Sequence, residues 1–468
     1  MTATATPTYT TLSHDIDTAL DRLRTAYTEG ITRDLDWREA QLDGILSFLD
    51  THGEALLDAM QSDLGRPRTE GWGADVGAAI GETAYLKKRF RKWAKPRRTP
   101  VSLIAQPGSA RIIPEPLGVA LVIAPWNYPV NLVLEPMAAA YAAGNAVVLS
   151  PSELAPATSA LICRELPHFL DPAGFDVFPG GPDVSSSLLE RRFDHVFFTG
   201  STQVGQIVME AAAKHLTPVI LELGGKSPTI VADDADIEVA GKRIAWGKGL
   251  NAGQTCIAPD YVLVSERRRD ELIDGIAEAW REFYGDDSST SPDFGRIVNE
   301  YHHDRLVGLL DRQAIAVGGG HDRTERFIEP TIVVDPDLDS PVMTDEIFGP
   351  ILPVITVADI HEAVRFVNDR PKPLALYVFS GDRDLADDVL ARTSSGGACI
   401  NHTLFHYAPH ELPFGGVGAS GMGRYHGKAG FDGFSNLKGV LRKPVKGETN
   451  VGYPPYTKLK DKLIRRLG

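Results

Sequence analysis

Between Gly118 and Gly225, short apolar runs alternate with segments of helical periodicity, and this alternation constrains the fold more than any other feature of the chain. A short apolar run bounded by turn residues is typical of a strand buried on both faces. Five such strands are predicted: Val119–Ala124, Ala146–Leu149, Asp176–Phe178, His195–Thr199 and Pro218–Leu223. Strand and helix in alternation indicate a parallel sheet covered by helices, which binds ligands beyond the carboxyl ends of its strands.

The rest of the chain extends this α/β prediction. Helices are expected at Leu134–Ala143, Thr158–Leu170 and Gln203–His215, and earlier at Asp34–Asp63 and Ala78–Trp93, before the basic run Lys95–Pro100. A second alternating series follows, with helices near Ile237–Gly249 and Arg269–Tyr284 and strands near Tyr261–Ser265 and Ile351–Ile355. Because 468 residues exceed what one hydrophobic core usually supports, two large lobes are expected.

Composition excludes several classes of function. The chain has 48 basic and 62 acidic residues and a formal net charge of −14, which argues against a nucleic-acid partner. No apolar run is long enough to span a bilayer, and Met1–Asp15 lacks the basic and apolar regions of a signal peptide. We therefore expect a cytoplasmic protein with no integral membrane segment.

Cysteine usage points to a reactive thiol rather than to a disulfide framework or a metal site. Cys163, Cys256 and Cys399 are too few and too scattered for disulfides or a four-ligand zinc site. An isolated cysteine is more often an inert core residue, and this interpretation fits Cys163 and Cys399, which lie in apolar segments. Cys256 instead follows the small, polar stretch 251–255, where the sulfur need not be buried, so it is the candidate nucleophile.

Two further side chains have the right chemistry to act with such a thiol. Glu222 ends a predicted strand among apolar neighbours, where desolvation would raise its pKa and make it a usable base; the alternative is a surface glutamate. Asn127 lies between two prolines at the end of the first strand and offers a fixed amide donor for an oxyanion, although asparagine beside proline is also common turn chemistry. The strand at His195–Thr199 runs into 200–205 and a helix, a junction that suits a pyrophosphate or simple tight packing.

Taken together, these segments resemble the aldehyde dehydrogenase superfamily from about Asp34 to Lys443. Seven motifs of that family occur in order: Pro125–Pro129, Pro151–Glu153, Phe198–Thr202, Leu221–Lys226, Gly253–Cys256, Glu346–Pro350 and Pro413–Gly416. The chain is more similar still to the class 3 branch, which handles fatty and aromatic aldehydes, through Ile112–Gly118, Ala258–Tyr261 and Gly421–Gly427.

The resemblance implies an aldehyde dehydrogenase-like architecture. It implies a Rossmann-like coenzyme-binding domain, an α/β catalytic domain, a small β bridging and oligomerisation arm and a C-terminal tail. In this sequence they would be residues 1–100 with 118–223, residues 224–418, residues 101–117 with 430–443, and residues 444–468. Enzymes of this branch are usually dimers, so a homodimer is expected.

The resemblance also implies a role for each matching residue. Cys256 would be the nucleophile, Glu222 the general base, and Asn127 with the Cys256 backbone N–H the oxyanion hole. Glu153 and Glu346 would hold ribose hydroxyls, and Phe348 would pack against the nicotinamide of NAD. The remaining cofactor contacts would come from Trp126, Ser150, Gly200, Ser201, Gly205, Leu223 and Gly224.

One departure from the family pattern bears on the choice of cofactor. Ser150 stands where most of the family has a lysine that can pair with the extra phosphate of NADP, and Glu153 nearby would repel that phosphate. We therefore expect NAD rather than NADP. The apolar and aromatic stretch Thr403–Pro409 favours a hydrophobic aldehyde.

Several other functions remain open from sequence. A CoA-acylating relative would typically lack a glutamate at the position of Glu222, and a semialdehyde-specific relative would need a cationic anchor that the sequence does not place. A cysteine-dependent esterase would have no use for the cofactor motifs, and an idle binding protein no use for the catalytic residues. The basic and apolar tail Lys458–Gly468 could touch a membrane surface, but a solvated terminal helix packed on the body is favoured.

Overall fold

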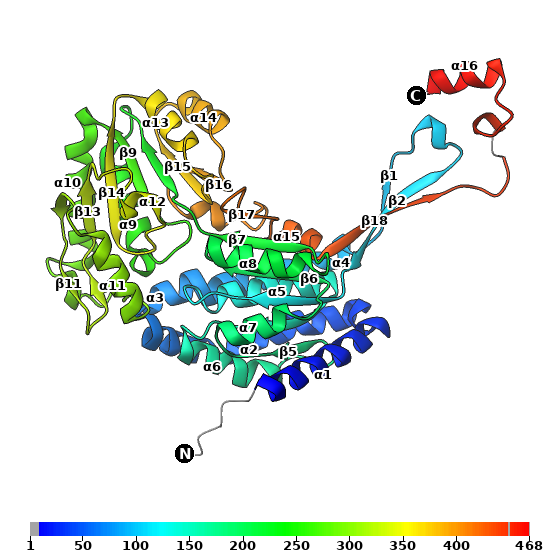
Figure 1. Cartoon of the computed structure of the whole chain (residues 1–468), viewed down its shortest axis with the longest axis horizontal. Coiled ribbons are helices and arrows are strands. Elements are labelled where there is room, and N and C mark those ends of the chain that lie inside the picture. Colours follow the sequence, from blue (N-terminus) through cyan, green and yellow to red (C-terminus); the bar gives the residue numbers. More distant parts are fainter. Residues whose placement is uncertain (1–8, 448–449, 468) are drawn as a thin grey trace.

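Two large sheets and a projecting three-stranded arm make up the protein (Figure 1). The computed structural model describes residues 9–447 and 450–467. Residues 1–8, which formed part of the signal-peptide argument and of the expected coenzyme domain, lie outside the described residues, as does Gly468 of the expected tail. The chain has the α/β architecture predicted from its alternating pattern.

The first sheet contains the five strands expected from sequence, each with its ends within one residue of the prediction. They are β3 (Val119–Ile123), β4 (Ala146–Ser150), β5 (Phe175–Val177), β6 (His195–Gly200) and β7 (Val219–Leu223). These strands are parallel and lie in the order β7-β6-β3-β4-β5, and the short β17 (Gly421–Met422) pairs antiparallel with β7 at the edge.

Helices bury both faces of this sheet, as the apolar strands require. Alternate residues of β3 belong to different cores: Ala120 and Val122 pack into one, and Leu121 into the other. The first face is covered by α2 (Leu35–Leu64), α4 (Gly77–Trp93) and α5 (Asn131–Ala143), and the second by α1 (Tyr9–Thr28), α7 (Pro182–Leu189) and α8 (Thr202–Ala213). The predicted helix Thr158–Leu170 is α6 (Pro156–Glu165) followed by a 3₁₀ turn.

The strand order creates a crevice at the carboxyl edge of the first sheet. β3 and β6 are neighbours, yet the chain leaves β3 through α5 towards β4 and leaves β6 through α8 towards β7. The two connections therefore diverge from the shared edge, and such a switch point is where open α/β sheets bind their ligands.

The second sheet has seven strands in the order β10-β13-β14-β9-β8-β15-β16. Its parallel strands are β8 (Pro228–Val231), β9 (Tyr261–Ser265), β13 (Thr331–Val334), β14 (Ile351–Val357), β15 (Ala375–Phe379) and β16 (Gly397–Ile400), and β10 (Ile315–Val317) is antiparallel. The expected helices are α9 (Ile237–Gly249) and α10 (Glu266–Tyr284). Cys256 lies between α9 and β9 and so reaches the amino edge of this sheet.

The arm is an antiparallel sheet of β1 (Arg97–Thr99), β2 (Ser109–Pro116) and β18 (Ser435–Arg442). It extends away from both large sheets in Figure 1. The terminal helix α16 (Lys458–Leu467) lies at the far end of the arm, beside the 3₁₀ turn Leu103–Ala105. The sequence favoured a terminal helix packed on the body of the protein. That prediction is wrong, because the helix lies at the end of the arm. No helix in the described residues is long and apolar enough to span a membrane.

Candidate active site

Cys256 follows an irregular turn that only certain residues can form. After α9, Asn251 and Ala252 both have φ of 51° and Gly253 has φ of 74°, so three consecutive residues adopt left-handed conformations. At Gly253 a Cβ atom would lie 2.3 Å from the Gly349 carbonyl oxygen, which leaves glycine as the residue that fits. The Tyr128 hydroxyl lies 2.7 Å from the Thr255 hydroxyl and fixes the residue before the cysteine.

Exposure does not separate Cys256 from the other two cysteines. Cys163, Cys256 and Cys399 are all free and all half-buried. Burial raises the pKa of the Cys256 thiol, and the nearby Glu346 and Glu222 carboxyls raise it further. The sequence predicts an accessible and therefore reactive thiol, whereas in the structure burial and two neighbouring carboxyl groups oppose the thiolate form of Cys256.

Glu222 lies in β7 between β6 and β17, with Gly421 as its antiparallel partner. Its side chain is 3% exposed, and neither carboxyl oxygen has a hydrogen-bond partner among the described residues. Burial raises the pKa of Glu222 well above its usual value, only partly opposed by Arg424. This is the direction expected from its apolar neighbours. A Cβ at Gly415 would lie 2.7 Å from Glu222 Oε1, so that glycine leaves space for the carboxyl group.

Cys256 and Glu222 line the same cavity of about 510 Å³, although Glu222 lies in the first sheet and Cys256 in the loop before β9 of the second. Much of the remaining lining is apolar or aromatic, including Leu132, Trp246 and Phe405. Four residues of the stretch Thr403–Pro409, singled out from sequence, contribute to it. The cavity therefore brings a thiol and a buried carboxyl group to one largely apolar chamber.

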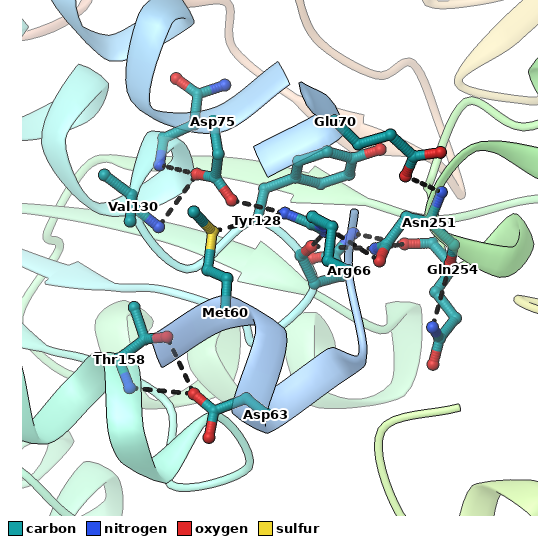
Figure 2. A network of polar contacts seen from close by, with 12 residues as sticks. Met60, Asp63, Arg66, Glu70, Asp75, Tyr128, Val130, Thr158, Asn251 and Gln254 are labelled. Carbon is teal, nitrogen blue, oxygen red and sulfur yellow. Dashed lines mark hydrogen bonds and ion pairs between the residues drawn. The ribbon is translucent and has the colours of Figure 1, made fainter. Parts of the chain in front are cut away.

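Asn127 is held against the loop that carries the cysteine. Its side-chain Nδ2 donates to the Gln254 carbonyl oxygen at 3.1 Å, two residues before Cys256. Its own carbonyl oxygen accepts hydrogen bonds from Arg66 and Asn251 (Figure 2). The amide nitrogen has a second N–H group that this bond does not use, but Asn127 is 3% exposed and is not one of the residues that line the cavity.

The expected nicotinamide residues meet where the two sheets face each other. Trp126 follows β3, and its ring lies 5.3 Å from that of Phe348 in an edge-to-face contact. Phe348 has φ of 50°, a rare conformation for an aromatic residue. At Gly224 a Cβ atom would come within 1.8 Å of Glu346 Oε2, so the absence of a side chain lets the Glu346 carboxyl approach the backbone after β7. Burial, together with Asp260, raises the pKa of Glu346 to about 8.

The expected pyrophosphate residues lie at the start of α8. Gly200 ends β6, and Ser201 is the N-cap of α8, its Oγ accepting from the Val204 N–H at 3.3 Å. Gly205 packs against Leu223, whose Cδ2 would lie 2.5 Å from a Cβ at Gly205. Close packing of helix on strand thus explains Gly205, while the exposed Ser201 leaves the amino end of α8 open to a ligand.

Ser150 and Glu153 lie at the carboxyl end of β4. The Ser150 side chain is buried, and its hydroxyl has no hydrogen-bond partner in the described part of the chain. Glu153 is exposed, and no ion pair with another described residue neutralises it. A ligand that reaches this edge therefore meets a hydroxyl and a carboxylate rather than a cation.

Two observations indicate that these residues fit a dinucleotide cofactor. Glu346 Oε1 is buried and has no partner among the described residues, so a hydroxyl group of a ligand could satisfy it. The space beside it exists because Gly224 has no side chain. Trp126, Ser150, Gly200 and Leu223 all lie at the carboxyl edge of the first sheet, which is the edge that contains the switch point.

Sequence reasoning missed the polar residues that support this site. The loop after β3 and the loop before Cys256 are held by Arg66, Glu70 and Asn251 (Figure 2). Gln254 lies within the motif Gly253–Cys256, but the sequence assigned it no role. Arg66 stands between two helices with no local pattern to mark it. Only its complete burial, seen in the structure, shows that it is more than a surface cation.

Comparison with known proteins agrees with this arrangement. The model of the aldehyde dehydrogenase family matches residues 3–440. Rat aldehyde dehydrogenase family 3 member B1 is 48% identical over 94% of both chains, and Arabidopsis thaliana family 3 member H1 is 44% identical over 97% of this chain and 95% of its own. The substrate-bound state of Staphylococcus aureus AldH superimposes with a TM-score of 0.93 at 43% identity, covering 96% of this chain and 99% of that one.

More distant structures include an indole-3-acetaldehyde dehydrogenase from P. syringae in complex with NAD⁺ and IAA, with a TM-score of 0.83 and 26% identity over 92% of this chain and 89% of that one. The resemblance to the class 3 branch is confirmed by the family 3 relatives. The family model and relatives cover nearly the whole chain, and two of its motifs bring Glu222 and Cys256 to one cavity. The protein therefore belongs to the aldehyde dehydrogenase family of oxidoreductases.

Proposed function

We propose that this protein oxidises a neutral, largely hydrophobic aldehyde to its carboxylic acid with NAD, through a thioester on Cys256 that water activated by Glu222 then hydrolyses. The observation that carries this proposal is the single cavity lined by both Cys256 and Glu222. A nucleophile and a base on one chamber are the two groups that acyl transfer to water requires.

In the first half of the reaction, the Cys256 sulfur adds to the aldehyde carbon as its proton passes to solvent water. Burial and the Glu346 and Glu222 carboxyls disfavour a free thiolate, so deprotonation accompanies attack. The oxyanion that forms accepts hydrogen bonds from Asn127 Nδ2 and from the Cys256 backbone N–H. When NAD is bound, it supplies the acceptor for the hydride that leaves the aldehyde carbon. A thioester on Cys256 remains.

In the second half, Glu222 removes a proton from the attacking water. Its raised pKa matches this task, because a carboxyl group without hydrogen-bond partners is a stronger base than an exposed one. Water attacks the thioester carbon, the C–S bond breaks, and the acid is released. Glu222 then passes its proton to the departing Cys256 sulfur, which restores the thiol.

The charges at the β4 edge support NAD over NADP. Glu153 has no neutralising ion pair among the described residues, and the Ser150 hydroxyl carries no charge to balance an added phosphate. A 2′-phosphate placed here would face a carboxylate, which costs binding energy.

The cavity lining bears on the substrate class. Among the described residues, the lining includes the Glu70, Glu135 and Glu222 carboxyls and no lysine or arginine. A semialdehyde that carries a carboxylate would therefore lack a cationic partner, which argues against a semialdehyde-specific enzyme. The apolar wall and the partner-free Glu222 favour a neutral aldehyde and hydrolysis of the thioester rather than its transfer to CoA.

The remaining sequence-based expectations are part of the same proposal. We assign the coenzyme domain to 1–100 and 118–223, the catalytic domain to 224–418 and the bridging arm to 101–117 and 430–443. The arm exposes Leu437 and Leu441, apolar side chains that a second copy of the chain would cover in a homodimer. We also propose that the protein is cytoplasmic.

The proposed function is tested by following reduced-cofactor absorbance with hexanal and benzaldehyde, with NAD and NADP supplied in parallel. We expect NAD to be reduced, NADP to be reduced much more slowly, and Cys256→Ala to be inactive with both aldehydes. If neither cofactor is reduced but a chromogenic ester is hydrolysed, the protein is an esterase and the redox proposal is wrong.

A further inference from the structure

A buried arginine joins the two loops on which the proposed chemistry depends. Arg66 follows Gly65, the residue that ends α2, and its side chain is 1% exposed. Its Nη1 pairs with Asp75 Oδ2 at 2.7 Å, and its guanidinium group lies 4.6 Å from the centre of the Tyr128 ring. Arg66 is not one of the residues that line the active-site cavity, whereas Tyr128, which its guanidinium group faces, is one of them. Figure 2 shows both residues.

The other two nitrogens of Arg66 reach both loops at once. Nη2 donates to the carbonyl oxygen of Asn127, in the loop after β3. Nε donates to Asn251 Oδ1 at 3.1 Å, in the loop that leads to Cys256. Asp75, the partner of Arg66, in turn accepts from the backbone N–H groups of Val130 and Asn131 at the start of α5.

The bond to Asn251 also decides which way that amide points. With Oδ1 turned towards Arg66, Asn251 Nδ2 faces two carbonyl oxygens and donates to Asn127 at 3.0 Å and to Gln254 at 3.1 Å. If the amide flipped, its oxygen would face those same two carbonyl oxygens, which is a repulsive contact. Arg66 therefore fixes the Asn251 amide, and Asn251 fixes the Asn127 carbonyl and the backbone next to Cys256.

We infer that Arg66 is a positioning residue for the oxyanion hole: it sets the orientation of the Asn127 amide relative to Cys256 without touching the substrate. The inference rests on the proposed roles of Asn127 and Cys256. A donor that must meet an oxyanion works only when its position is fixed before the reaction, and a displacement of about 1 Å costs about 100-fold in rate. Lysine at this position could still pair with Asp75, but a single ammonium group cannot also hold both loops.

The test compares two reactions of the same sulfur that differ in their need for an oxyanion hole. Acylation of Cys256 by p-nitrophenyl acetate passes through a tetrahedral oxyanion, whereas alkylation by iodoacetamide is a direct displacement with no oxyanion. In Arg66→Lys we expect the acylation rate to fall about 10-fold to 100-fold and the alkylation rate to stay within about two-fold of wild type.

Two further variants make the comparison specific. Arg38→Lys is the matched control, since Arg38 is also buried and donates to backbone carbonyls, those of Thr32 and Ala142, away from the cavity. We expect it to leave both rates unchanged. Asn251→Asp keeps an acceptor for Arg66 but loses the donor to Asn127, so it should show the same selective loss of acylation while leaving the Arg66–Asp75 ion pair in place.

The outcomes separate this inference from the proposed function. A parallel fall of both rates in Arg66→Lys or Asn251→Asp, or no change in either, overturns the positioning role. Selective loss of acylation in both variants, with Arg38→Lys normal, supports it. Reaction with the ester that persists in Cys256→Ala refutes the proposed nucleophile, and this inference falls with it.

Discussion

Replacing Glu222 by glutamine separates what its carboxyl group does for catalysis from what it costs in stability. The side chain is 3% exposed and lacks hydrogen-bond partners, and burial raises its pKa well above the usual value. Above about pH 4.3 the unfolded chain releases this proton while the folded protein retains it. The folded protein therefore binds more protons than the unfolded chain, and its stability falls as pH rises until the folded pKa is reached.

The size of this effect follows from the linkage between pH and stability. For each pH unit between the unfolded and folded pKa values of Glu222, the free energy of unfolding of wild type falls by about 1.4 kcal/mol. Glutamine does not titrate, so the variant does not lose this stability. The free energy of unfolding of Glu222→Gln should therefore exceed that of wild type by an amount that grows with pH. In thermal unfolding, the difference in Tm should widen by about 1–2 °C per pH unit above about pH 4.3.

The assay measures Tm of wild type and Glu222→Gln at about pH 5, 6 and 7, beside a single turnover with NAD and hexanal. Glu210→Gln is the matched control, because Glu210 is exposed on α8 and its replacement should not change the pH dependence. We expect Glu222→Gln to retain its first turnover of NADH while steady-state turnover falls by about 10²–10⁴. Parallel Tm curves for Glu222→Gln and wild type, or normal steady-state turnover, would refute the assignment of Glu222 as a buried base with a raised pKa.

Three further substitutions test the cofactor edge and the cavity. Gly224→Ala places a methyl group within 1.8 Å of the Glu346 carboxyl, so we expect KM for NAD to rise at least about 10-fold in steady-state kinetics; an unchanged KM would show that Glu346 does not contact the cofactor. Ser150→Lys adds a cation beside Glu153, and the ratio of kcat/KM for NADP to that for NAD should rise by about 10-fold or more, whereas a constant ratio contradicts the charge argument. Ala78→Phe fills part of the cavity lining, so kcat/KM should fall more for dodecanal than for propanal, and an equal fall would exclude this wall from the substrate path.

Local patterns were sufficient to predict the parallel sheets. The strand Val119–Ile123 is buried along its whole length, so the apolar run seen in sequence corresponds directly to its packing. The first hundred residues are predicted to be largely helical, but the bounds of α1 could not be predicted because its buried positions, including Ile16, Leu20 and Leu23, are interspersed with charged residues in a Thr-rich segment. The placement of α16 beside the arm depends on contacts distant in sequence, which periodicity alone does not encode.

Some features of the candidate site could likewise be predicted from sequence, and others could not. Glu222 was predicted to have a raised pKa from its apolar neighbours alone, and the structure gives that direction. The expected accessibility of Cys256 did not separate it from Cys163, because exposure depends on how two sheets pack around the loop. Arg66 could not have been found, since its partners Asp75 and Asn251 come from segments 9 and 185 residues away in sequence.

The central claim is that the acyl group is carried on Cys256 and released by Glu222. It is tested most directly by mixing Glu222→Gln with NAD and hexanal, quenching in acid and mapping the modified peptide by mass spectrometry. The account predicts a hexanoyl thioester on the peptide that contains Cys256, formed in step with NADH. A hexanoyl group on the peptide of Cys163 or Cys399, or NADH formed with no acyl-enzyme at all, would contradict it.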